Sequence, residues 1–151
     1  MARQTKVSVY IKSALPASYR PLLARAAKAA VEKLPAKTWA GRKSVSLSVS
    51  IVGRSAIRKL NLSFRGKDKP TDVLSFPSAP VPGSDFAGDV IVCWAVGRTQ
   101  TEEFGTTPRE EIQRLVVHGV LHVFGFDHER SARDERVMFG LQEKILRSLK
   151  K

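Results

Sequence analysis

The sequence predicts an α+β fold in which helices pack against one small, mixed β-sheet. Three observations lead to this prediction. The chain has 151 residues, of which 42% are apolar, enough to bury one core. Strand patterns come mostly first, and helical patterns dominate the last third. No repeat, low-complexity tract or long linker interrupts the chain, so we predict a single domain over residues 1–151.

Alternation of apolar and polar residues predicts the strands. The pattern is strictest over residues 45–51, where valine, leucine and isoleucine alternate with serine. Pro77 should end the next strand, and the Pro- and Gly-containing stretch 78–87 should be a loop. The predicted strands span residues 7–11, 45–51, 73–76 and 89–92.

Helical spacing of apolar residues predicts the helices. The best-defined start is Thr107, Pro108 and Glu110, because threonine can cap, proline suits the first helical position and glutamate completes a capping box. This helix should stop at Gly125. The predicted helices span residues 18–33, 54–63, from the end of the last strand to about 103, 107–124, and from 131 onward.

The net charge of +12 is unevenly distributed. Residues 1–67 carry 15 Lys and Arg and a single acid, Glu32, whereas residues 68–151 carry 11 basic and 13 acidic groups. This segregation favours a polyanion partner over a merely solvated basic surface. An arginine-rich organelle presequence is a weaker alternative, since residues 7–11 already have a strand pattern.

The composition favours a cytoplasmic protein with no membrane contact. Cys93 is the only cysteine, so no internal disulfide can form, and a buried place in the core is expected for it. No apolar run approaches the roughly 18 residues of a membrane span. Residues 1–6 lead into an alternating pattern and not into a continuous apolar stretch, so no secretory signal is expected.

All three histidines lie within 11 consecutive positions. His118 and His122 are four residues apart, so they should occupy neighbouring turns of one helix face. Gly125 permits a left-handed turn that would bring His128 back as a third ligand. Three imidazoles leave one tetrahedral position open for water, which is typical of a catalytic zinc site. We therefore predict one Zn²⁺ ion here, with another divalent transition metal left open; Asp127 would either orient a histidine ring or cap the turn.

The spacing of the three histidines matches the zinc motif of the metzincin peptidases. Those enzymes need a glutamate directly after the first histidine as general base, and this chain has Gly119 there. A peptidase is therefore not expected.

Two longer blocks resemble another family, the YbeY family of metal-dependent, single-strand-specific endoribonucleases. The Gly88-Asp89 pair agrees as well. The blocks are Leu60-Asn-Leu-Ser-Phe-Arg65-Gly-Lys-Asp68-Lys-Pro70-Thr-Asp72-Val-Leu-Ser-Phe76-Pro77 and His118-Gly-Val-Leu-His122-Val-Phe-Gly125-Phe-Asp127-His128.

The resemblance implies a small, mostly parallel sheet flanked by helices, with zinc on His118, His122 and His128. It also implies cleavage of single-stranded RNA in ribosomal RNA maturation and ribosome quality control, on ribosomal RNA and ribosomal particles.

The family's important arginine falls on Arg65, so Arg65 and His118 are the expected catalytic residues. Arg65 would bind a phosphate, and Lys67 would either extend its positive field or lie in a solvated turn, as would Lys69. Phe76, Phe86 and Trp94 are candidate stacking platforms, although each is more often a core residue.

Two other functions remain open at this stage. One is a zinc hydrolase of a non-nucleic substrate, which would turn over small amides or esters with little dependence on salt. The other is a non-catalytic ribosome-assembly factor whose metal only fixes the last two helices. The sequence leaves the attacking nucleophile, the cleavage site and the oligomeric state undetermined.

Overall fold

A four-stranded sheet forms the centre of the part of the chain that the structure, a computed structural model, describes, residues 6–39 and 42–150. The strands are β1 (Lys6–Lys12), β2 (Ser44–Ile51), β3 (Val73–Pro77) and β4 (Phe86–Val92). Their order is β1-β2-β4-β3; β2 is parallel to both β1 and β4, and β3 is antiparallel to β4. The α+β class and the mixed, mostly parallel sheet are confirmed. The expectation about a secretory signal falls largely on residues 1–5, which lie outside the described residues.

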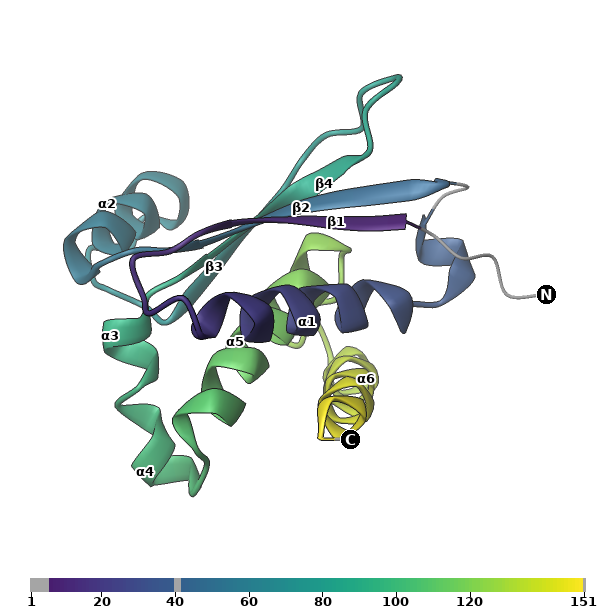
Figure 1. The fold of residues 1–151 in the computed structure, drawn as a ribbon. Coiled ribbons are helices and arrows are strands. Elements are labelled where there is room, and N and C mark those ends of the chain that lie inside the picture. The colour runs from purple at the N-terminus through teal and green to yellow at the C-terminus, as the bar shows by residue number, and fades with distance from the viewer. Residues whose placement is uncertain (1–5, 40–41, 151) are drawn as a thin grey trace.

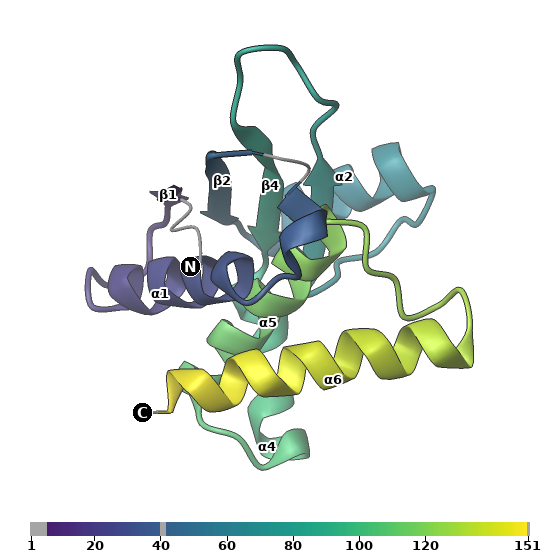
Figure 2. The same ribbon diagram turned by 90° about the vertical axis from the view of Figure 1, so that its right-hand side faces the viewer.

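The long helices α1 (Tyr19–Glu32), α5 (Pro108–Val123) and α6 (Ala132–Leu149) lie on one face of the sheet (Figure 1). α1 and α5 pack directly on the strands, and α6 packs across α1 and α5, as Figure 2 shows. None of the helices within residues 6–39 and 42–150 is long and apolar enough to cross a bilayer. The helices are α1 (Tyr19–Glu32), α2 (Arg54–Arg65), α3 (Trp94–Gly97), α4 (Gln100–Phe104), α5 (Pro108–Val123) and α6 (Ala132–Leu149), with a 3-10 turn at Ala36–Trp39.

Alternation in β2 decides which face of the sheet is buried. Val45, Leu47 and Val49 are fully buried in the main core, together with the inner faces of α1, α5 and α6. α2 packs instead through Ile57 into a smaller cluster that includes Leu74 of β3. This second cluster holds α2 beside β3, the strand at one edge of the sheet.

The local signals at both ends of α5 act as predicted. Thr107 Oγ1 accepts a hydrogen bond from the Glu110 amide, and the Glu110 carboxylate accepts one from the Thr107 amide. At the other end, Gly125 has φ of 94° and its amide donates to the His122 carbonyl, while the next amide donates to the Leu121 carbonyl. This pair of bonds is the Schellman arrangement, which reverses the chain after the helix.

Three local predictions were wrong or incomplete. β4 begins at Phe86, inside the predicted loop, because Phe86 pairs with Ser46 of β2. The helix predicted after β4 is two short helices, α3 and α4. Near their junction the hydroxyls of Thr99 and Thr101 donate to backbone carbonyls three residues earlier, which competes with a regular helix. The 3-10 turn at Ala36–Trp39 was not predicted.

Candidate metal centre

The structure brings His118, His122 and His128 together. His118 and His122 lie on successive turns of α5, and His128 returns from the loop after Gly125. One ring nitrogen from each histidine lies within 4.8 Å of the other two. The Nε2 atoms of His118 and His122 are 3.1 Å apart.

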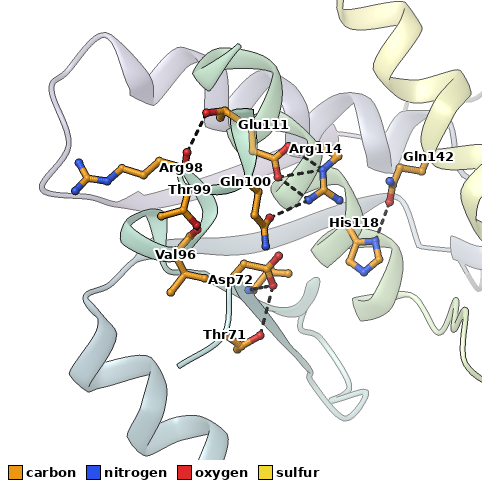
Figure 3. A network of polar contacts seen from close by, with 12 residues as sticks. Thr71, Asp72, Val96, Arg98, Thr99, Gln100, Glu111, Arg114, His118 and Gln142 are labelled. Atoms are coloured by element: carbon orange, nitrogen blue, oxygen red, sulfur yellow. Dashed lines mark hydrogen bonds and ion pairs between the residues drawn. The ribbon is translucent and has the colours of Figure 1, made fainter. Parts of the chain in front are cut away.

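Gln142 of α6 fixes the tautomer of His118 (Figure 3). Its Oε1 lies 2.8 Å from His118 Nδ1. An amide oxygen can only accept, so Nδ1 must carry the proton and the lone pair remains on Nε2. Gln142 is 7% exposed, and no sequence pattern connected it to the histidines.

The turn that carries His128 is fixed by its own hydrogen bonds. The Asp127 carboxylate accepts from the Glu129 amide at 2.9 Å, which lowers the pKa of Asp127, so this carboxylate stabilises the turn. Arg130 donates to the Gly125 carbonyl at 2.9 Å. Within the described residues, Nδ1 of His128 is buried without a hydrogen-bond partner. A metal ion is one partner that would satisfy this nitrogen.

Burial favours the neutral form of His118 and His122. It is the main cause that lowers the pKa of His118 to about 4, although the Gln142 hydrogen bond opposes the shift. Burial also lowers the pKa of His122, with the neighbouring His128 adding to the effect. Neutral imidazole is the form that binds a metal ion, so the lowered pKa values of His118 and His122 favour metal binding.

These donors fit a tetrahedral transition-metal ion. Zn–N bonds of about 2.0–2.1 Å place two ligand nitrogens about 3.3 Å apart, close to the 3.1 Å between His118 and His122. Three neutral nitrogens are a common ligand set for zinc, although imidazole also suits other divalent transition metals. The cluster could hold a metal ion.

The histidines open into a cleft of about 700 Å³ that also contains Arg65. Strand β3 forms one wall, and the end of α2 supplies Phe64 and Arg65. The Arg65 side chain makes no hydrogen bond or ion pair with any described residue. Three carboxylates also line the cleft: Asp72, Asp127 and Glu129. The cleft therefore joins a candidate cation site to a free guanidinium group.

The family model described as Endoribonuclease YbeY matches residues 12–150, nearly the whole chain. The chain belongs to the YbeY family. Membership makes it an RNA-cleaving hydrolase.

Individual YbeY relatives agree with this assignment. Endoribonuclease YbeY of Sulfurihydrogenibium sp. (strain YO3AOP1) is 46% identical over 108 residues, covering 70% of this chain and 71% of the relative. The same-named protein of Aquifex aeolicus is 38% identical over 138 residues, covering 86% and 92%. A solution structure from Thermotoga maritima aligns over 93% of this chain and 86% of its own, with a TM-score of 0.59 and 27% identity.

Gly119, which stands where the metzincins have a glutamate, has no room for a side chain. A β carbon on Gly119 would lie 2.5 Å from Val90 Cγ1 and 3.2 Å from Val73 Cγ2. The Ser75 hydroxyl also donates to the Gly119 carbonyl at 2.8 Å. Helix α5 therefore sits too close to the sheet for the peptidase glutamate.

The aromatic and basic candidates divide into two groups. Phe76 lines the cleft, whereas Trp94 is 8% exposed in the core and Phe86 is half-buried on β4. Lys67 and Lys69 are exposed but do not line the cleft. Phe64, which no sequence pattern singled out, is 67% exposed and does line the cleft.

A partly buried ion pair within α5 lies one turn before His118. Glu111 is fully buried and accepts hydrogen bonds from Arg114, the shortest at 2.6 Å. Arg114 also donates to Gln100 of α4 at 3.4 Å (Figure 3). The positive charge of Arg114 contributes to the lowered pKa of His118. This network links α4 to the helix that carries His118 and His122.

Proposed function

We propose that this chain is a zinc-dependent, single-strand-specific endoribonuclease that acts in the cytoplasm in ribosomal RNA maturation and ribosome quality control. The proposal rests on one observation. Nitrogens of the three histidines lie close together in a cleft that also contains Arg65, whose side chain is unpaired within the described residues. YbeY membership supports RNA as substrate, and the excess positive charge of residues 1–67 favours a polyanion. We take residues 1–151 as one such domain.

The three histidines, Arg65 and Gln142 have distinct roles in this proposal. His118, His122 and His128 would hold the ion, and Gln142 orients His118. A zinc ion held there would supply Lewis acidity and a hydroxide nucleophile near neutral pH. The Arg65 guanidinium donates two parallel hydrogen bonds to phosphate oxygens and stabilises the negative charge that develops there during cleavage.

Metal analysis combined with a cleavage assay tests the proposal. Purified protein should contain about one zinc per chain and cleave single-stranded RNA faster than a duplex of the same sequence. A chelator should abolish cleavage, and zinc should restore it. Cleavage that persists after complete metal removal would overturn the proposal. Cells lacking the protein should accumulate unprocessed ribosomal RNA; normal processing would remove the ribosomal role.

Arg65→Ala separates catalysis from stability. The side chain is exposed and unpaired within the described residues, so zinc content and melting temperature should not change. Cleavage should fall by about 100-fold, the usual loss when one charge-stabilising donor is removed. Arg109→Ala is the matched control, because Arg109 is exposed on α5 and does not line the cleft. Equal cleavage by the two variants would exclude Arg65 from catalysis.

A further inference from the structure

Phe64 is the most exposed aromatic residue of the cleft. It lies in the last turn of α2, and 67% of its surface is accessible. Isolated apolar residues on a surface need no functional explanation. Phe64 differs because it lines the same cleft as Arg65 and the three histidines.

Contact with one other ring holds Phe64 in place. Its ring centroid lies 5.0 Å from that of Phe76, with 67° between the ring planes. Phe76 is half-buried on β3 and packs against the small cluster around Ile57 and Leu74. The contact anchors Phe64 to the sheet edge and still leaves most of its ring accessible, so a flat apolar surface is present before any ligand arrives.

The neighbours of Phe64 have the chemistry of a polynucleotide site. Arg65 follows it directly and is unpaired within the described residues. A nucleic acid strand presents phosphates along its backbone with a base beside each, so an aromatic ring next to a guanidinium group matches a base next to a phosphate. A protein partner could use Phe64 and the exposed Leu62, but it would have no use for the candidate metal site in the same cleft.

We infer that Phe64 is a stacking platform for an unpaired RNA base beside the phosphate bound by Arg65. The inference rests on the proposed function, because it requires RNA in this cleft. In a duplex each base is already paired and stacked, so its face is not available to the ring. Phe64 thereby contributes to the preference for single strands. Every base has such a face, so the platform does not select a base sequence.

Equilibrium binding to zinc-loaded protein tests the inference. The probes are a fluorescent, cleavage-resistant 2′-O-methyl phosphorothioate single strand of twelve residues and the same backbone with stable abasic residues. Wild type should bind the base-bearing strand about tenfold more tightly, since stacking contributes about 1–3 kcal/mol per base. Phe64→Leu should lose this preference while binding the abasic backbone as wild type does. Phe64→Trp should retain the preference.

Tyr10→Leu is the matched control. Tyr10 is 64% exposed on β1, at the opposite edge of the sheet from β3. The Tyr10→Leu variant should bind the base-bearing and the abasic strands as tightly as wild type does. All variants should keep the zinc content and melting temperature of wild type. The inference fails if Phe64→Leu keeps the preference for bases, or if it weakens binding of both probes equally. Failure of the proposed function is a separate result: zinc-loaded wild type would not cleave unmodified RNA.

Discussion

Gln142 determines which nitrogen of His118 is free to bind metal. Its amide oxygen accepts the Nδ1 proton at 2.8 Å, which leaves the lone pair on Nε2, facing His122. Groups that orient metal-binding histidines in this way typically change metal affinity by about 10- to 100-fold when they are removed.

Gln142→Leu should therefore weaken zinc binding by about 10- to 100-fold, because the ring loses its fixed tautomer. Gln142→Glu keeps an acceptor and should stay near wild type. Competition with a chelator of known affinity measures both variants. A Gln142→Leu variant that binds zinc within twofold of wild type would show that Gln142 does not position His118.

The lowered pKa of His118 has a consequence for metal-free protein. Burial lowers the pKa from 6.5 to about 4, so between these values the unfolded chain binds a proton that the folded chain does not. Stability should be unaffected by this group above pH 6.5 and fall by about 3 kcal/mol as the pH drops to about 4. Urea unfolding of metal-free wild type and His118→Gln across this range measures the effect. Equal pH dependence in the two proteins would contradict it.

At the scale of elements, the close approach of α5 to the sheet depends on Gly119. A β carbon there would meet Val90 Cγ1 at 2.5 Å, and valine in a central strand cannot easily move away. Gly140 provides a contrast, because it lies in α6 with no atom within 4 Å of an added β carbon.

Gly119→Ala should destabilise the protein by about 1–2 kcal/mol, since overpacking outweighs the gain in helix propensity. Gly140→Ala should stabilise it by about 0.5–1 kcal/mol, since only the propensity term remains. Urea unfolding of both variants gives the comparison. If both substitutions changed the free energy of unfolding in the same direction, packing at Gly119 would not be tight.

Local signals made some elements predictable and left others hidden. The ends of α5 could be predicted from the sequence because a capping box and a glycine stop lie within a few residues of the helix. The early start of β4 was not, because it depends on pairing with β2, about 40 residues earlier in the chain. The same limit applies to the cleft. The histidines are close in sequence. The Gln142–His118 contact, however, forms only when α6 packs against α5, and the Phe64–Phe76 contact forms only when α2 packs beside β3.

For the whole molecule, the net charge of +12 should make RNA binding sensitive to salt. Each phosphate contact to a single strand contributes about −0.7 to the slope of log affinity against log salt concentration. With three or more contacts, affinity should fall about tenfold or more between 50 and 200 mM KCl. Fluorescence anisotropy measures this, with zinc content as the control. A constant affinity over that range would argue against a polyanion substrate.

The nearness of the three histidines along the chain also affects how much the ion can stabilise the fold. A denatured chain keeps these imidazoles within 11 residues of one another, so it can still chelate zinc weakly. Metal stabilises a protein only through the difference between its affinities for the native and denatured states. Zinc should thus raise the melting temperature by less than its affinity for the native protein alone implies.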